Sequence, residues 1–476
     1  MRRLRIKLIT VPWELEVPTL SLACLAAVSP ERHFEVAIVD ALRHRVHVDE
    51  PVDLVGITAS TPAINAAYAL ADRFRARGVP VVIGGHHVTA MPKEGLQHAD
   101  AVVIGEGETA WTRILDDLGQ NPKRIQGVYR DAAPDLTTLP APSVKHLSLE
   151  RHGPYNYPII ASRGCPEVCS FCFAKRMSKG FRTYPIARVL EQIRAKPEWA
   201  KMLYFVDDNL AGDRDYAKEL FRAMSREKNR VHFGMQVRSE LADDEEMLRL
   251  AYEAGCAFVS SGYESVNQET LNSQKKRALV ADYKRRIKAI QREGMIASGN
   301  FMFGFDGDDL GTFERTLSFL HESGIYHATF TTEIPFPGTG TYRKYEKEGR
   351  LLTRDYDKYV GKDHVVVQPI QMSARELRDG VRRVALSYFS PKRAAERAHA
   401  AYENKKLFTE LRGSSRVAAI VALSAYQVYQ WHYRMTSAGY WLYRKFLPHA
   451  KWAYPEEWLS RTSFRLPQTE PVESPA

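Results

Sequence analysis

The segment Arg163-Gly164-Cys165-Pro166-Glu167-Val168-Cys169-Ser170-Phe171-Cys172 places three cysteines in a CxxxCxxC pattern on one short loop. The apolar residues 158–162 before it predict a β-strand, so the loop leaves the carboxyl end of that strand. Three thiolates around a [4Fe–4S] cluster leave one iron without a protein ligand and open for chemistry. Structural zinc would need a fourth ligand, and no second CxxC or HxxxH is present to supply one.

Around this loop the chain alternates strand and helix patterns. Helical periodicity over residues 243–254 and 283–292 separates apolar runs and favours parallel strands with right-handed crossovers. We therefore predict a partial (β/α)6 barrel that binds its ligands at the carboxyl ends of the strands. The predicted strands are 158–162, 203–206, 232–237, 258–261, 296–305 and 327–334.

A second α/β series precedes the barrel. Ile64, Ala67, Ala71 and Phe74 recur at helical spacing between two short β-branched runs, which predicts an open, doubly wound parallel sheet. Such a sheet binds its ligand beyond the carboxyl ends of its strands. Its predicted strands are 6–10, 34–39, 54–58, 81–85 and 101–105, and the ends of the last three read Thr58-Ala59-Ser60-Thr61, Gly84-Gly85-His86-His87 and Gly105-Glu106-Gly107-Glu108.

We divide the chain into five parts: an α/β domain (1–125), a Pro-containing linker (126–150), the barrel (151–345), a mainly helical C-terminal domain (346–465) and a disordered tail (466–476). Aromatic residues are frequent in the C-terminal domain, and they predict a cap on the barrel or, alternatively, an interfacial or substrate-lining helix. They are Tyr426, Tyr429, Trp431, Tyr433, Tyr440, Trp441 and Tyr443.

Composition narrows the function classes. Five cysteines in 476 residues, three of them in one loop, do not form a disulfide framework and indicate a reducing cytoplasm. The net charge of +10 comes without a block of five basic residues, so we expect no nucleic-acid partner. No apolar run approaches the ~18 residues that span a bilayer, although peripheral membrane contact stays open.

The cysteine spacing, the aromatic residue before the third cysteine and the preceding strand resemble the radical S-adenosylmethionine (SAM) superfamily. The resemblance implies that Cys165, Cys169 and Cys172 hold a [4Fe–4S] cluster whose open iron chelates SAM and cleaves it to a 5′-deoxyadenosyl radical. The ends of the second to fourth barrel strands resemble segments of that family that contact SAM. The implied SAM-binding residues are Phe171, Asp207, Asp208, Arg238 and Glu264.

The N-terminal domain resembles the Rossmann-like cobalamin-binding domain joined to many such enzymes. The implied contacts are Thr58, Ser60, Thr61, Gly84, Gly85, His86, Gly105 and Glu106. One departure concerns the DxHxxG motif, which supplies a histidine to cobalt in one branch of that family. Here the segment reads Asp40-Ala41-Leu42-Arg43-His44-Arg45, so a leucine stands at the histidine position. We therefore expect cobalamin without a protein nitrogen on its lower axial face.

The segments Gly304-Phe305-Asp306-Gly307-Asp308-Asp309 and Pro335-Phe336-Pro337-Gly338-Thr339 resemble cobalamin-dependent radical enzymes that methylate hopanoids or antibiotic precursors. This implies methylation of an unactivated carbon of a small-molecule or lipid substrate with two SAM molecules, in natural-product biosynthesis, and a reductant such as flavodoxin or ferredoxin. The alternative is a ring-forming or ring-rearranging enzyme with the same cofactors and no methyl transfer. No catalytic side chain is assigned from the sequence.

Overall fold

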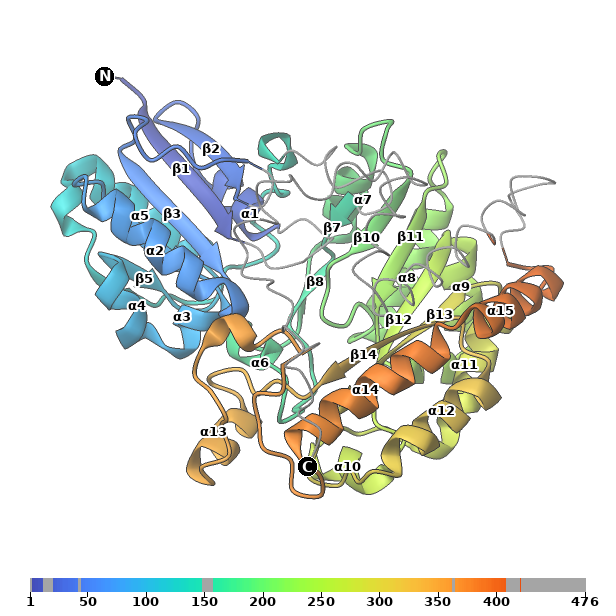
Figure 1. The fold of residues 1–476 in the computed structure, drawn as a ribbon. Helices are drawn as coiled ribbons and strands as arrows, with labels where there is room; N and C mark the ends of the chain where they lie inside the picture. Colours follow the sequence, from blue (N-terminus) through green and yellow to red (C-terminus); the bar gives the residue numbers. More distant parts are fainter. Residues whose placement is uncertain are drawn as a thin grey trace, which may run out of the picture.

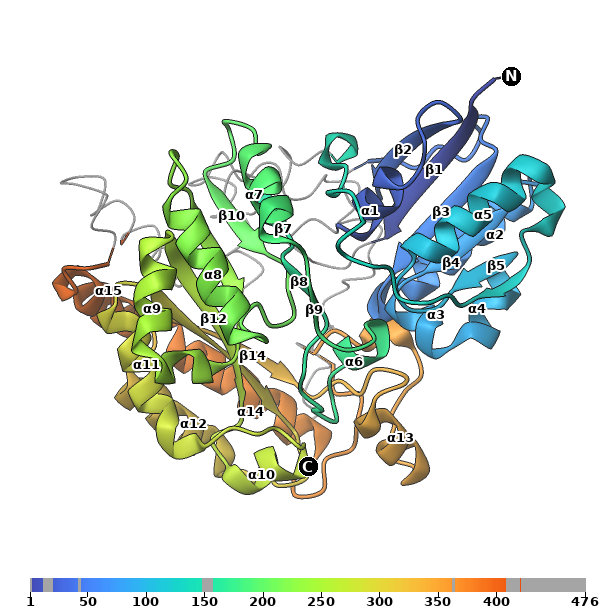
Figure 2. The same ribbon diagram turned by 180° about the vertical axis from the view of Figure 1, so that it is seen from behind.

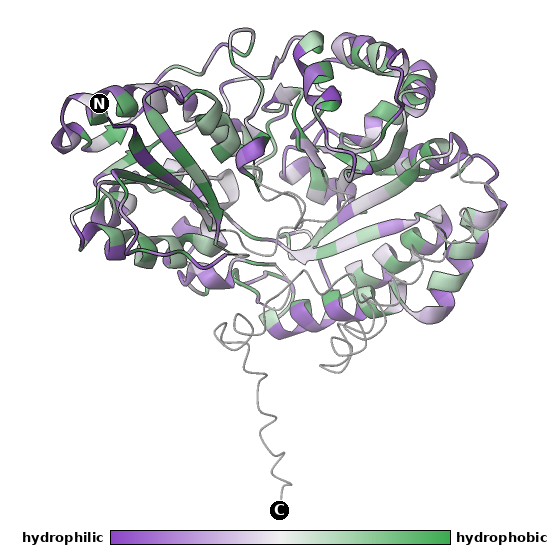
Figure 3. Cartoon of the chain, turned by 90° about the horizontal axis from the view of Figure 1, so that it is seen from above, coloured by the Kyte–Doolittle hydropathy of each residue, from purple (hydrophilic) through white to green (hydrophobic). Residues whose placement is uncertain are grey.

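The computed structural model describes residues 2–11, 20–41, 44–147, 157–361, 364–407 and 420. Two six-stranded parallel sheets dominate it and lie side by side (Figure 1). Viewed from above, hydrophobic colour follows most of the strands, while helices surround each sheet (Figure 3). The predicted aromatic C-terminal helices, the tail and Leu42 lie outside the described residues.

The first sheet has the strand order β2-β1-β3-β4-β5-β6. Helices cover both of its faces: Leu22 and Trp111 pack on one side, and Ala67 and Phe74 on the other, so the predicted doubly wound sheet is confirmed. The strands are β1 (Leu4–Val11), β2 (Phe34–Asp40), β3 (Leu54–Ala59), β4 (Val81–Gly84), β5 (Ala101–Val103) and β6 (Gly127–Tyr129), and the helices are α1 (Ser21–Ala27), α2 (Ile64–Arg75), α3 (His86–Ala90), α4 (Pro92–His98) and α5 (Glu108–Gln120).

The start of the predicted linker differs from expectation. Residues Gly127–Tyr129 form β6, which pairs in parallel with β5 at the edge of the first sheet. Tyr129 is buried against the helices there and donates a hydrogen bond to Asp117. The first domain thus extends beyond residue 125, because one edge strand follows its last long helix.

The second sheet has the order β14-β13-β12-β11-β10-β7, with every neighbouring pair parallel, as in a partial barrel. All six predicted strands are present, with ends shifted by a few residues. They are β7 (Tyr157–Ile159), β10 (Met202–Phe205), β11 (His232–Gln236), β12 (Cys256–Glu264), β13 (Ile296–Phe303) and β14 (His327–Thr332). The helices that cover them are α7 (Ile186–Arg194), α8 (Arg214–Ser225), α9 (Glu245–Glu253), α10 (Gln268–Ser273), α11 (Tyr283–Arg292) and α12 (Thr312–Ser323).

A small hairpin of β8 (Ser162–Arg163) and β9 (Arg182–Thr183) lies between the two sheets, together with α6 (Ala174–Met177) (Figure 2). The cysteine loop connects β8 to α6, so it emerges in the space that the two domains share. Short 3-10 helices complete the described elements: Thr61–Ala63, Pro122–Arg124, Val144–His146, Ser239–Asp243, Val280–Asp282 and Tyr356–Lys358.

The region after residue 340 does not form one separate helical domain. Helix α13 (Gly340–Lys347) and the irregular segment after it contribute Tyr345, Tyr356, Tyr359 and Val366 to the core of the first domain. Helix α14 (Ala374–Tyr388) instead packs on β14 and α12 of the barrel, and α15 (Pro391–Glu403) follows it. The described C-terminal part is therefore shared between the two domains, because its apolar side chains are buried against both.

None of the helices within the described residues is long and apolar enough to cross a membrane.

Candidate active site

The cysteine loop begins at a glycine that no other residue could replace without rearrangement. Gly164 has φ = +80°, and a Cβ there would lie 2.3 Å from the carbonyl oxygen of Gly180. Further along, the Ser170 N–H donates to the Gln274 carbonyl at 3.0 Å, and the Ser170 carbonyl accepts from the Gly340 N–H at 2.8 Å. The loop is thus fixed to the barrel on one side and to α13 on the other.

All three loop thiols are free and at least partly accessible. Burial is the main cause that raises the pKa of Cys172 to about 11; the backbone N–H of Ala174 lowers it, and the nearby Asp208, Cys169 and Cys165 add to the rise. Burial likewise raises the pKa of Cys165 and of Cys169. Three close thiols that resist ionisation suit a cationic iron–sulfur centre, because a bound metal stabilises the thiolate form.

No three His, Cys, Asp or Glu side chains of the described part converge around a single ion position. A cubane cluster does not require such convergence, since each thiolate binds a different iron. The donor set on the loop therefore fits a cluster better than a mononuclear site.

Asp207 and Asp208 are adjacent but face different surroundings. The buried Asp207 carboxylate accepts from the Ser162 hydroxyl at 2.5 Å and from the Ala161 N–H at 3.2 Å, and its pKa rises to about 7 through burial. It therefore supports the strand that leads into the cysteine loop, and its oxygens are not directed to a ligand. Asp208 lies near the thiols of Cys165 and Cys172 and retains exposed surface.

Arg238 is not free to pair with the SAM carboxylate in this structure. Its guanidinium forms ion pairs with Glu167 of the cysteine loop and with Glu240 at 2.5 Å, and it donates to the Arg277 carbonyl. The side chain lines a cavity of about 390 Å³ whose wall includes Pro166 and Glu167. Arg238 thus braces the loop from outside.

Glu264 comes close to the loop through an unusual backbone. It has φ = +62° and ends β12 where the register with β13 shifts, so its buried carboxylate faces Lys276 at 3.6 Å. Both side chains act on the Cys169 thiol electrostatically. Phe171 packs against Phe305 of the segment after β13, with ring centroids 6.1 Å apart. Glu264 and Phe171 therefore both lie beside the cysteine loop.

The carboxyl edge of the first sheet faces this loop. Gly85 has φ = +105°, and a Cβ there would lie 2.6 Å from the Ala59 carbonyl oxygen and 3.0 Å from the Thr58 hydroxyl oxygen. The Thr89 hydroxyl donates to the Gly85 carbonyl at 2.8 Å and accepts from the Gly105 N–H at 3.1 Å. These packing contacts account for the small residues at the predicted positions Thr58, Gly85 and Gly105 without a ligand. Ser60 and Gly84 lie at the same edge and are partly exposed.

The adjacent residues His86 and His87 lie in different surroundings. His86 is exposed and packs edge-to-face on Phe173, directly after the cysteine loop, with centroids 5.2 Å apart. Partial desolvation beside Phe173 and its other neighbours lowers the pKa of His86. His87 is fully buried and bonds Glu94 at 3.0 Å and Thr61 at 3.3 Å, so neither His87 nor Thr61 is open to a ligand.

Glu106, predicted to contact cobalamin, forms ion pairs that join the two domains. Its carboxylate pairs with Arg163 at 3.2 Å and with Arg182, while Arg163 also pairs with Glu108 at 2.5 Å. The side chains of Arg163, Glu106 and Glu108 are only 9%, 6% and 6% exposed. Because Arg163 and Arg182 face each other across the β8–β9 hairpin, this small sheet presents two guanidinium groups to the cobalamin-side edge.

Sequence reasoning missed this network as well as Ser170 and Lys276. One signal was available: Arg163 stands between the predicted strand 158–162 and the first glycine and cysteine of the loop, where an apolar run leads directly into the site. A buried arginine needs carboxylate partners. Nothing in the sequence identified those partners as Glu106 and Glu108, more than fifty positions earlier.

Comparison with known proteins supports the same arrangement. The radical SAM superfamily model matches residues 159–320, and the B12 binding domain model matches residues 6–115. Bacteriochlorophyllide d C-12(1)-methyltransferase of Chlorobaculum tepidum is 30% identical over 335 residues, covering 68% of this chain and 72% of that protein. The chain belongs to the B12-binding radical SAM enzymes.

A second relative of this family, bacteriochlorophyllide d C-8(2)-methyltransferase of the same organism, is 28% identical over 361 residues, covering 71% of this chain and 78% of that protein. Among solved structures, the cobalamin-dependent SAM radical enzyme OxsB with aqua-cobalamin and SAM has a TM-score of 0.66 at 12% identity. The match covers 94% of this chain and 75% of OxsB and shows a shared fold.

These comparisons confirm the predicted family and its cofactors, a [4Fe–4S] cluster, SAM and cobalamin. As a B12-binding radical SAM enzyme, the chain carries its cysteine loop within the matched barrel and its glycine-rich edge within the matched B12 domain.

Proposed function

We propose that this enzyme transfers a methyl group to an unactivated carbon of a small-molecule or lipid substrate and consumes two SAM molecules per turnover. The observation that carries the proposal is the similarity to two methyltransferases. The buried ion-pair network of Arg163, Glu106 and Glu108 adds that the cysteine loop is joined to the edge of the B12 domain. A methyl transfer that uses both cofactors needs them in one shared space. The methyltransferase relatives support the same reaction class.

Within this proposal, Cys165, Cys169 and Cys172 hold the cluster, and Asp208 and Glu264 contact the SAM bound to it. When bound, the cluster supplies the electron that cleaves SAM, and cobalamin carries the methyl group. The protein's own part is to hold these groups in place and to exclude water from the radical. Phe171, Phe173 and His86 suit that role, because their rings pack around the loop.

The proposal includes the partners. The cluster needs an outside electron, and a flavodoxin or ferredoxin is the class of donor that we expect. The five free cysteines support a reducing cytoplasm as the site of action. We propose no nucleic-acid partner, and natural-product biosynthesis remains the expected setting, with peripheral membrane contact only if the substrate is a lipid.

Product analysis tests methyl transfer directly. The reconstituted enzyme is incubated with SAM bearing a deuterated methyl group, a reductant and candidate substrates. A methyltransferase yields S-adenosylhomocysteine and 5′-deoxyadenosine together and places the labelled methyl group in the product. If 5′-deoxyadenosine and altered substrate form without S-adenosylhomocysteine, the ring-forming or ring-rearranging alternative is correct and the methyl-transfer proposal fails.

The cobalt environment is a separate part of the proposal. We expect no protein nitrogen on the lower axial face, because Leu42 stands at the histidine position and His87 is engaged with Glu94 and Thr61. The test is the electron paramagnetic resonance spectrum of the cob(II)alamin form. Bound corrin without nitrogen superhyperfine splitting supports the expectation. Splitting that disappears in a His86→Ala or His44→Ala variant contradicts it.

A further inference from the structure

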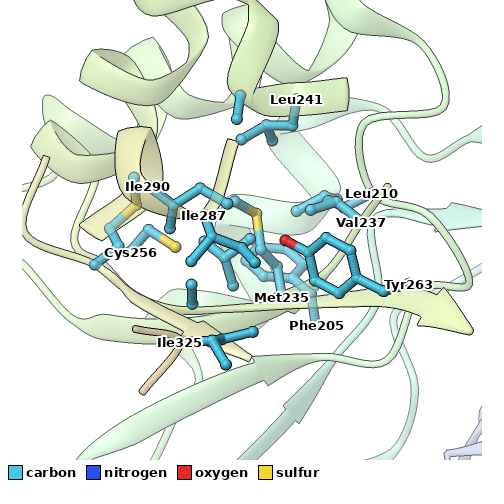
Figure 4. Close-up of a cluster of buried hydrophobic side chains, with 14 of the residues drawn as sticks. Phe205, Leu210, Met235, Val237, Leu241, Cys256, Tyr263, Ile287, Ile290 and Ile325 are labelled. Carbon is cyan, nitrogen blue, oxygen red and sulfur yellow. The ribbon is translucent and has the colours of Figure 1, made fainter. Parts of the chain in front are cut away.

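The barrel strands are almost free of charge. Across the six strands of the barrel sheet, Glu264 at the end of β12 is the one Asp, Glu, Lys or Arg. Side chains such as Phe205 and Met235 pack against Leu241, Ile287 and other residues of the surrounding helical layer (Figure 4). Successive residues of a strand point to opposite faces of the sheet. The strand residues next to Phe205 and Met235 therefore face the inside of the barrel.

The inward face carries a row of neutral polar side chains across four neighbouring strands. Gln236 lies opposite Ser260, and Asn300 lies opposite Thr329. The Thr329 hydroxyl donates to Asn300 Oδ1 at 2.7 Å, and Asn300 Nδ2 donates to Ser260 Oγ at 3.2 Å. Gln236 and Thr329 are exposed at the two ends of the row, whereas Ser260 is buried.

Below this row the barrel is closed by apolar contacts. Phe258 and Ile296 of the inward face pack with Ala401, Leu407 and Ile420 from the C-terminal part of the chain. Between this base and the row, Ser298 bonds the ring of His327 at 2.7 Å. Burial lowers the pKa of His327 to about 4, so its ring is uncharged at neutral pH. Among the described residues, no strand side chain of the inward face offers a cation at this depth. The buried Arg397 acts electrostatically on His327, but its guanidinium donates to the Tyr388 carbonyl at 2.7 Å.

The row keeps unused hydrogen-bonding capacity. Asn300 has one amide N–H left after its bond to Ser260, and the exposed Thr329 oxygen has free lone pairs. Along β12, Ser260 lies four residues before Glu264, or about 13 Å below the cysteine-loop end of the barrel. A substrate anchored at the row therefore extends toward the cofactors.

The geometry points to the barrel interior as the site for an uncharged, mostly apolar part of the substrate, whose hydroxyl or carbonyl oxygen is recognised by Asn300 and Thr329. A carboxylate or phosphate at this depth would lose its hydration without gaining a cation from the described strand residues of the inward face, which disfavours it strongly. This inference rests on the proposed methyl transfer, since it names the substrate class for that reaction. Charged groups of the substrate would lie at the mouth, near Lys276 or Glu264.

Two rigid probes that share one apolar body separate the classes. Binding of 1-adamantanol and of adamantane-1-carboxylate to the cluster- and cobalamin-loaded enzyme is measured by calorimetry at pH 8. We expect the alcohol to bind at least tenfold more tightly than the carboxylate. An Asn300→Leu variant should weaken alcohol binding about fivefold, the value of one hydrogen bond. Asn272→Leu on α10 is the matched control and should change neither affinity.

A gain-of-function variant strengthens the test. Asn300→Lys places a cation in the row and should improve carboxylate binding at least tenfold, while thermal unfolding verifies that each variant is folded. Three outcomes would overturn the inference. The wild-type enzyme could bind both probes with equal affinity, or it could bind neither. The Asn300→Leu and Asn272→Leu variants could also have equal effects. Formation of S-adenosylhomocysteine is assayed on the same preparations. Its absence with intact probe binding contradicts methyl transfer and leaves the substrate site standing.

Discussion

Replacing Arg163 with methionine should destabilise the protein far more than removing an ordinary surface arginine. Glu108 would lose its cation at 2.5 Å, whereas Glu106 would keep Arg182. Because the Glu108 side chain is only 6% exposed and its second oxygen has no hydrogen-bond partner, the remaining carboxylate would be buried without compensation. Removing one partner of such a buried ion pair lowers the free energy of unfolding by about 3–5 kcal/mol.

Calorimetric unfolding of the purified chain measures this effect. For a domain of this size, about 3–5 kcal/mol corresponds to a decrease in Tm of roughly 6–20 °C. Arg188→Met is the matched control, since Arg188 pairs with Glu191 at 2.8 Å on the surface of α7 with side chains 33% and 53% exposed. Removing such a pair changes stability by less than about 1 kcal/mol.

A double variant tests the physical cause. Arg163→Met/Glu108→Met removes both charges and fills the space with apolar atoms, so most of the lost stability should return. Equal losses for the single and double variants would show that Arg163 acts through packing, for example against the Tyr184 ring at 5.6 Å. Equal losses for Arg163→Met and Arg188→Met would refute the role of the network in joining the domains.

Three further outcomes are expected. Replacing all three loop cysteines with alanine should abolish iron binding, while Cys256→Ala should keep about four irons per chain by iron assay, because Cys256 is a core residue. Burial raises the pKa of Glu333 to about 8, although the hydrogen bond from the Tyr345 hydroxyl lowers it, so the folded state binds up to one more proton than the unfolded state between about pH 4 and about pH 8. Stability should therefore fall as pH rises from about 4 to about 8, and Glu333→Gln should flatten that slope in denaturant titrations. Gly85→Ala should abolish cobalamin binding in absorption titrations, whereas Gly78→Ala, with φ = +75° and open space around it, should lower stability by about 1 kcal/mol and leave binding intact.

The strands of both sheets could be predicted because β-branched runs of suitable length alternate with helical periodicity. Strand β6 could not, since the three residues Gly127–Tyr129 are too few to give a periodic signal. The segment containing Tyr356 and Val366 was assigned to a separate domain because its partners, such as Ile57 and Ala67, lie about three hundred residues earlier. Local pattern carries no information about contacts over such distances.

The candidate site divides in the same way. The cysteines and the glycine-rich edge have local sequence motifs, so their positions could be predicted from the spacing of the residues in each motif. The roles of Asp207 and Asp208 were not, because one residue step at a strand end decides whether a carboxylate faces the backbone of Ala161 or the cysteine thiols. The inward row of Asn300 and Thr329 depends on the register of β13 with β14, which a single sequence does not determine.

The β8–β9 hairpin connects the cysteine loop directly to the edge of the B12 domain, in addition to the contacts that the C-terminal part makes with both domains. Gly164 directly follows Arg163, and the first cysteine follows Gly164, so the cluster loop starts two residues from a guanidinium bound to the B12 domain. Across the hairpin, Arg182 binds the same carboxylate of Glu106. A movement of one sheet relative to the other would have to break buried ion pairs or displace the cysteine loop with it. The loop therefore moves with the edge that carries Gly105. With the cluster on this loop and cobalamin at this edge, as proposed, the hairpin would hold the two groups at a fixed separation.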